Sequence, residues 1–222
     1  MKRFLPALLL VAGCGAPEPT HAYAYACNGH PVPLAQLTGP PATRLGPDGR
    51  AALQGQEVGR VEELEKWHIV EESADRVALI REIDEPVRAD SGDSTHQYLS
   101  IERRLPGGGW MLNTSTRCDL KRVVPGLGPA DVALGSASGT RLNLLVTERA
   151  CASGQSAAGR IELVELEETD EEVRLTVAVR EGQWGEIVTC QGNPPTPFTV
   201  ELSRPLDDRA VLNVGVHPAR RL

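Results

Sequence analysis

Strict alternation of apolar and polar residues is the clearest pattern in the second half of the chain. Between 172 and 180 every second position is apolar, namely Val173, Leu175, Val177 and Val179. This two-residue period is typical of a strand with one buried face. Similar runs predict further strands at 141–149, 160–168, 186–190 and 199–203. We therefore expect an antiparallel sheet or a small sandwich over 141–222.

The first half combines a helical pattern with alternating ones. Apolar residues spaced over 49–64 predict a helix capped by Asp48, although Gly55 and Gly59 weaken the pattern. Alternation then predicts strands at 67–71, 76–83, 97–105 and 110–118. The stretch 84–95 is acidic and rich in turn residues, which predicts a solvated loop. We expect one helix packed on a four-stranded antiparallel sheet.

Proline and glycine mark the divisions of the chain. Residues 125–140 carry prolines, glycines and small residues without an apolar period, which predicts a linker between an N-terminal half at 26–124 and a C-terminal half at 141–222. The proline-rich run 193–197 lacks several ladder donors and belongs at a sheet edge or in a turn. The expected fold class is α+β, mostly β, with two antiparallel β-rich halves.

The first residues have the order of a secretory signal. Lys2 and Arg3 precede an apolar run that ends in small residues before Cys14. The run Val11-Ala12-Gly13-Cys14 resembles the lipobox of bacterial lipoproteins, which implies that 1–13 is removed and that Cys14 carries lipid, palmitate included. Residues 14–25 would then form a flexible tether. Ordinary cleavage after Ala22, Ala24 or Ala26 is the alternative.

Charge and hydropathy exclude two classes of protein, nucleic-acid binders and proteins that span a membrane with a helix. The formal charge is −7 and no cluster of Lys and Arg is visible, so nucleic acid is excluded as a partner. The leading apolar run is about half the length that a membrane-spanning helix needs, and no later stretch comes close. We expect an extracytoplasmic protein held to a bacterial membrane through a lipid at Cys14.

The cysteine count fits an oxidising compartment. With Cys14 assigned to lipid, an even number remains, namely Cys27, Cys118, Cys151 and Cys190. Three pairings are possible. We favour Cys27 with Cys118 and Cys151 with Cys190, because each bond then lies within one half and the join stays outside both loops.

Two motifs of the second half resemble a known family. The runs 146–154 (VTERACASG) and 189–197 (TCQGNPPTP), followed by 205–209 (PLDDR), are similar to those of uncharacterised actinobacterial extracytoplasmic lipoproteins. The first half fits more loosely, through Cys27-Asn28-Gly29, a strand at Trp67, and Gly109-Trp110 leading to Cys118. The resemblance supports the cysteine pairing and implies no particular activity.

One candidate binding site follows from the second disulfide. A disulfide holds its two Cα atoms about 4.4–6.8 Å apart, so it would gather Glu148, Arg149 and Asn193, with Arg209 close by. These groups favour either loop-fixing hydrogen bonds and an ion pair, or a polar ligand site. Trp184, between glycines at an expected hairpin tip, is a further candidate contact for a partner.

Catalytic and metal-binding signatures are missing from the sequence. The run 135–139 has Ala137 where a nucleophile elbow needs serine. The histidines are dispersed, at His21, His30, His68, His96 and His217. The acidic runs 62–65 and 165–172 lack a calcium-loop pattern. We therefore expect neither metal nor cofactor and assign no catalytic residue.

The leading functional hypothesis is a non-catalytic binding or interaction module of the cell envelope, which recognises a protein or a small ligand. The alternative is an extracytoplasmic hydrolase whose site lies near Cys151 and Cys190. A deep pocket lined by Glu148, Arg149 and Asn193 would favour the hydrolase, whereas a flat surface would favour the module.

Overall fold

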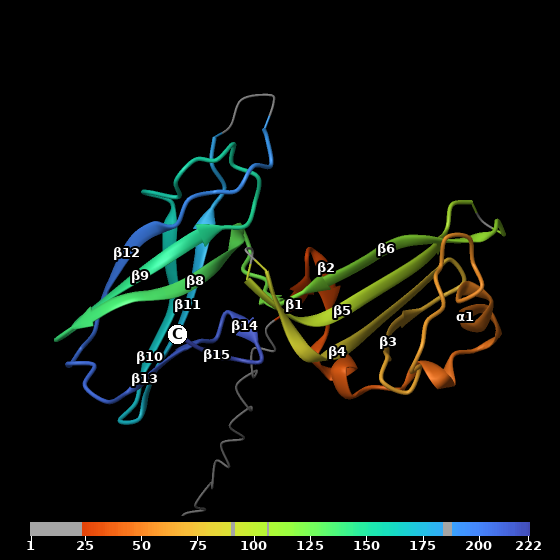
Figure 1. Cartoon of the computed structure of the whole chain (residues 1–222), viewed down its shortest axis with the longest axis horizontal. Helices are drawn as coiled ribbons and strands as arrows, with labels where there is room; N and C mark the ends of the chain where they lie inside the picture. Colours follow the sequence, from red (N-terminus) through yellow and green to blue (C-terminus); the bar gives the residue numbers. More distant parts are fainter. Residues whose placement is uncertain (1–23, 90–91, 106, 184–187) are drawn as a thin grey trace, which may run out of the picture.

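The computed structural model describes residues 24–89, 92–105, 107–183 and 188–222, and the chain forms two β-rich parts that meet at a narrow junction (Figure 1). The fold is mostly β with one α-helix and several antiparallel sheets, which confirms the predicted fold class. No helix of the described residues is long and apolar enough to span a membrane.

A four-stranded antiparallel sheet forms most of the first part. Its strands are β3 (His68–Glu72), β4 (Arg76–Ala89), β5 (Gly92–Arg103) and β6 (Trp110–Cys118), in that order. Alternate residues of β4 and β5 supply a buried cluster that contains Val77, Leu79 and Ile101. Trp67 and Trp110 complete this cluster, and each is covered by an arginine, Arg81 and Arg103 respectively.

The helix of the first part is shorter than the prediction of 49–64. It is α1 (Pro47–Ala52), preceded by the 3₁₀ turns η1 (Leu34–Thr38) and η2 (Ala42–Arg44). Its N-cap is Gly46, with no side-chain cap, so the predicted cap by Asp48 is wrong. The chain leaves the helix because Gln56 exchanges backbone hydrogen bonds with β6, at 2.8 Å to the Trp110 carbonyl and 2.9 Å from the Leu112 N–H.

Gly55 explains why this crossing is tight. A Cβ at this glycine would lie 2.8 Å from the Trp110 carbonyl oxygen. The two backbones can therefore approach only where the side chain is absent. Apolar residues beyond Ala52, including Val58, Val61 and Leu64, still pack on the Trp67 cluster, but from non-helical backbone.

The predicted solvated loop at 84–95 is also wrong in its backbone. Strand β4 extends into this stretch as far as Ala89 and β5 begins at Gly92, and their register pairs Val87 with Ser94 and Arg88 with Asp93. Acidic and turn-forming residues did not prevent pairing, because ladder hydrogen bonds come from the main chain.

A second small sheet lies at the junction and draws its strands from distant parts of the chain. It contains β1 (Tyr25–Cys27), β2 (His30–Val32), β7 (Leu120–Arg122) and β14 (Val216–His217), in the order β14-β7-β1-β2. Tyr25 and Leu120 pack against Ile80 and Tyr98 beneath it. The last strand, β14, comes from near the end of the chain, so the two parts are tied together twice.

The second part is a twisted arrangement of antiparallel strands with one parallel pair. Its strands are β8 (Leu127–Ser138), β9 (Arg141–Glu148), β10 (Ile161–Glu168), β11 (Glu172–Arg180), β12 (Thr196–Glu201), β13 (Ala210–Asn213) and β15 (Arg220–Arg221). The order is β12-β9-β8-β11-β13-β15, with β10 on the other side of β11. The alternating residues Val173, Leu175 and Val177 face its core, as the sequence predicts.

The predicted linker at 125–140 is mostly strand. A turn at Pro125 and Gly126 is closed by a bridge between Val124 and Leu127, and β8 then pairs with both β9 and β11. Small side chains gave no apolar period, yet the backbone completes the sheet. The halves therefore meet at a turn of the chain and not at a long linker.

The predicted strand at 186–190 is not formed in its described portion, residues 188–190. The edge prediction for 193–197 is confirmed, because Pro197 lies in β12 at one end of the sheet order.

Both predicted disulfides are present. Cys27 joins Cys118 with the Cα atoms 5.4 Å apart, and Cys151 joins Cys190 at 4.5 Å. The first connects β1 to the end of β6, and the second connects two loops of the second part. Two such bonds indicate an oxidising, extracytoplasmic environment.

Candidate functional site

Beside the second disulfide, two of the predicted site residues, Glu148 and Asn193, are in contact. The Asn193 amide donates hydrogen bonds of 2.9 Å to the Glu148 carbonyl and 2.7 Å to the Ala150 carbonyl. Across the disulfide, Ser153 and Thr189 exchange hydrogen bonds of 3.0 and 3.1 Å. Asn193 therefore fastens one loop to the chain beside Cys151, which is a structural task.

Glu148 faces the core because it ends the alternating inner row of β9. Arg160 holds this buried carboxylate with both ends of its guanidinium, at 2.9 and 2.5 Å. The hydrogen bond that Arg160 donates to the Glu148 carboxylate raises the pKa of Arg160 above its usual value. A bidentate pair of this kind satisfies the buried charge internally.

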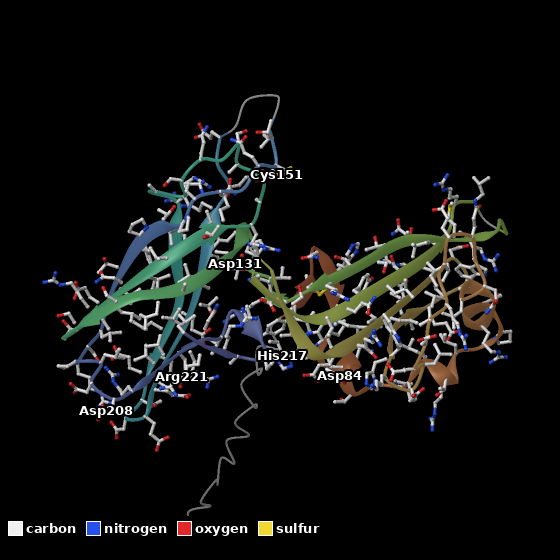
Figure 2. All side chains as sticks on the ribbon, in the orientation of Figure 1. Asp84, Asp131, Cys151, Asp208, His217 and Arg221 are labelled. Atoms are coloured by element: carbon white, nitrogen blue, oxygen red, sulfur yellow. A yellow bond between two sulfur atoms is a disulfide. The ribbon has the colours of Figure 1, made fainter. Side chains whose placement is uncertain are left out.

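Arg209 lies elsewhere, so the prediction that it joins this cluster is wrong. Its guanidinium pairs with Glu168 at 2.8 Å and donates to the carbonyls of Arg204, Pro205 and Leu206. Figure 2 labels its neighbour Asp208 at the opposite end of the second part from Cys151. Strand β12 lies between Cys190 and Arg209 in the sequence. It runs along the sheet and so carries the chain away from the disulfide. Two further predicted residues, Cys14 and Trp184, lie outside the described residues.

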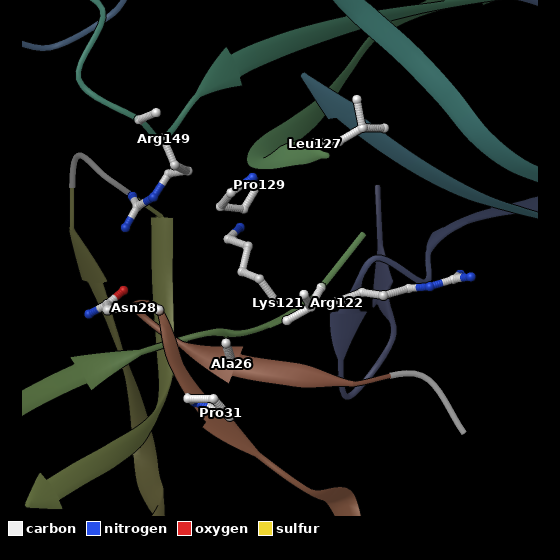
Figure 3. Close-up of a pocket in the computed structure, with 11 residues that line it drawn as sticks. Ala26, Asn28, Pro31, Lys121, Arg122, Leu127, Pro129 and Arg149 are labelled. Carbon is white, nitrogen blue, oxygen red and sulfur yellow. The ribbon is translucent and has the colours of Figure 1, made fainter. Parts of the chain in front are cut away.

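A pocket of about 510 Å³ lies between the two parts (Figure 3). Both parts contribute to its walls. The first part contributes Ala26, Asn28, Gly29 and Pro31 from β1, β2 and the turn between them, together with Lys121 and Arg122 of β7 and the following Val123. The second part contributes Leu127, Pro129, Arg149 and Ala150. Of the predicted site residues, Arg149 lines it, whereas Glu148 and Asn193 do not. The pocket is therefore a different site from the predicted polar cluster.

Two basic side chains enter the pocket from opposite walls. In Figure 3, Lys121 extends from the first part towards Pro129, and Arg149 extends from the second part towards Asn28. Asp131 of β8 holds both of them, at 2.5 Å from the Lys121 ammonium and 3.2 Å from the Arg149 guanidinium. Arg122 instead runs away from the pocket and pairs with Glu165.

A second cavity of about 540 Å³ collects three histidines that the sequence left dispersed. His68 comes from β3, His96 from β5 and His217 from β14, and Glu82 and Asp84 line the same space. Burial lowers the pKa of His96, and the nearby His217 lowers it further against the opposing effect of Glu82. No group of three His, Cys, Asp or Glu side chains in the described part of the chain is arranged to hold a metal ion.

Sequence reasoning missed the pocket because its residues carry no shared motif. Ala26 and Lys121 become neighbours only through the pairing of β1 with β7, and Leu127 and Pro129 come from the stretch that was predicted as a linker. Comparison of the chain with protein-family models, curated proteins and solved structures finds no match.

Proposed function

We propose that this chain is a lipid-anchored, extracytoplasmic binding module that holds a small ligand in the pocket between its two parts. The observation that carries the proposal is the pocket itself. Its volume of about 510 Å³ falls in the range of roughly 300–1,000 Å³ common for ligand sites. It is mostly apolar with a few placed polar groups, and it lies where two structural units meet, which is a frequent position for binding sites.

The contacts around the second disulfide favour binding over hydrolysis as the chain's task. Glu148, the strongest candidate for an acid or base there, accepts two hydrogen bonds from Arg160 and is almost fully buried. Asn193 is engaged with two main-chain carbonyls. A general base must reach the proton it removes, and these groups instead hold the loop in place.

The cellular position is proposed from the sequence together with the disulfides. The lipobox-like run before Cys14 supports lipidation there, and the resemblance to extracytoplasmic lipoproteins agrees with it. Mass spectrometry of the mature protein checks this directly. Lipid on an N-terminal Cys14 is the expected result, and a mature chain that begins after Ala22, Ala24 or Ala26 would contradict the anchor.

A filled-pocket variant tests the binding function. Ala150 lines the pocket and is exposed, so Ala150→Trp should occupy the space without disturbing a core. Ala158 is exposed on a nearby loop outside the pocket, and Ala158→Trp is the matched control. The three proteins are screened against a library of small molecules by thermal shift. We expect ligands that stabilise the parent chain and Ala158→Trp but not Ala150→Trp. Ligands that stabilise all three equally, or none at all, would refute the pocket as the binding site.

A further inference from the structure

The charged side chains that enter the pocket are basic. Among the described residues that line it, only Lys121, Arg122 and Arg149 are charged, and of these Lys121 and Arg149 extend into the space, whereas Arg122 runs away from it to Glu165. The chain as a whole has a formal charge of −7, so this local sign is opposite to the average. Asp131 is not among the lining residues and orients both Lys121 and Arg149 by ion pairs, and Asp119 lies 3.9 Å from the Lys121 ammonium. Oriented cations in a partly enclosed space favour an anionic group there.

The remaining wall is apolar. It is made by Ala26, Pro31, Val123, Leu127, Pro129 and Ala150. Val123 is 47% exposed, which makes it one of the few large hydrophobic side chains left open to solvent in the described part of the chain. Apolar surface of this kind gains free energy when a ligand covers it. The pocket thus offers cations at two points and a hydrocarbon surface beside them.

The position of the pocket links it to the expected anchor. The Val123 N–H donates a hydrogen bond of 2.7 Å to the carbonyl of Ala24, so the chain enters the fold beside the pocket wall. Ala24 follows Cys14 by ten residues, and a fully extended chain of that length spans at most about 35 Å. If Cys14 carries lipid, the pocket lies within that distance of the bilayer surface.

We infer that the pocket binds an anionic amphiphile, a phosphate or carboxylate group joined to an alkyl chain, with Arg149 and Lys121 at the anion and Val123 and Leu127 against the alkyl chain. This inference rests on the proposed binding function and adds the ligand class to it. The same chemistry is presented by an anionic lipid of the membrane and by a free alkyl phosphate or fatty acid, and the nearness of the anchor makes either source accessible.

Titration calorimetry with matched probes tests the ligand class. The protein is the mature chain 14–222 with Cys14→Ser, exported so that both disulfides form. The probes are dodecyl phosphate, dodecyltrimethylammonium and inorganic phosphate, each below its micelle concentration. We expect dodecyl phosphate to bind, and the other two to bind at least about tenfold more weakly, because each lacks one half of the recognition.

Paired variants assign the binding to the pocket. Arg149→Gln should weaken dodecyl phosphate binding about tenfold through the loss of one charge-assisted hydrogen bond. Arg141→Gln is the control, since Arg141 starts the strand after which Arg149 follows and also pairs with a carboxylate, Glu201. Ala150→Trp should abolish binding and Ala158→Trp should preserve it.

Phosphatidylglycerol vesicles that compete with dodecyl phosphate would support a bilayer lipid as the source, and vesicles that do not compete would support a free amphiphile.

Three results would overturn the inference, and the Ala150→Trp variant separates its failure from failure of the binding function. Equal binding of dodecyl phosphate and dodecyltrimethylammonium, or no effect of Arg149→Gln, would refute the anionic class. If Ala150→Trp still removed ligands found in the small-molecule screen, the binding module would stand with another ligand. Dodecyl phosphate binding that survives Ala150→Trp would refute this pocket as its site.

Discussion

Arg160 and Glu148 face one another inside the second part and form a two-pronged ion pair, with the Glu148 side chain 3% exposed. Removing one partner of a buried pair leaves the other charge without compensation. We expect Glu148→Gln to lower the free energy of unfolding by about 3 kcal/mol, measured by denaturant titration.

The control for this prediction is the surface pair of Arg141 with Glu201, whose side chains are 70% and 65% exposed. Glu201→Gln should cost less than about 0.5 kcal/mol, because solvent screens an exposed pair. Equal losses of unfolding free energy in the two variants would contradict the prediction that the buried pair stabilises the fold more than the exposed one.

Arg209 is expected to serve stability and not ligand binding. Its side chain is 5% exposed and its guanidinium is used by Glu168 and main-chain carbonyls. Arg209→Ala should lower the free energy of unfolding by about 3 kcal/mol and leave ligand binding in the pocket unchanged. Loss of binding without loss of stability would restore Arg209 to the site.

Glu168 gives the fold a dependence on acid. The N–H of Ser203, which donates to its carboxylate at 2.7 Å, and then Arg209 hold the pKa of Glu168 below its ordinary value of 4.5. Its contribution to stability is therefore complete above pH 4.5 and is lost as the pH falls through the lower pKa of the folded state. Melting temperatures recorded from about pH 7 to about pH 3 should fall less steeply in Glu168→Gln than in the parent chain. Parallel curves would refute this assignment.

His96 also makes the fold less stable as the pH falls, but at a higher pH than Glu168 does. Burial lowers its pKa below 6.5, so the folded state favours the neutral ring. As the pH falls below 6.5 the unfolded chain takes up the proton first, and stability decreases until the lower pKa of the folded state is passed.

Two variants check the role of His96. His96→Gln should remove the loss of stability in this window, and His217→Gln should reduce it, because His217 opposes protonation of His96. The measurement is the denaturation midpoint on both sides of pH 6.5. An unchanged acid response in His96→Gln would assign the effect to another group.

The disulfides should contribute according to the loops that they close. Their sequence separations are 91 for Cys27–Cys118 and 39 for Cys151–Cys190. Chain entropy gives upper limits of about 4.6 and about 3.9 kcal/mol for these loops. Replacing each pair by alanine should destabilise the chain, and the first pair should cost more, as read from denaturant titration. A neutral replacement of either pair would contradict the prediction.

Local periodicity was sufficient for much of the fold. The strands around Val173 and Trp110 were predictable because a buried face imposes a two-residue period on the side chains. The cysteine pairing followed because each bond lies within one half of the chain. Periodicity did not reveal the strand at 127–138, because its small side chains leave no apolar period and its pairing uses main-chain groups.

The pocket and the histidine cavity could not be predicted, for a different reason. Lys121 meets Asp131, and His217 approaches His96, only after strands distant in sequence have paired. Among the polar cluster, sequence reasoning placed Asn193 beside Glu148 correctly, because a disulfide is a fixed short distance. It failed for Arg209 because nothing in the sequence gives the direction of the strand that precedes it.

The strand β14 lies beside β7, on the opposite side from β1, so residues from both ends of the described chain complete one small sheet. A protease that cut the turn at Pro125 would not release two independent pieces. The N-terminal fragment would lack an edge strand, and the C-terminal fragment would carry a strand without its neighbour. The two fragments are therefore complementary to one another, and they would stay associated after the cut in the manner of a split protein.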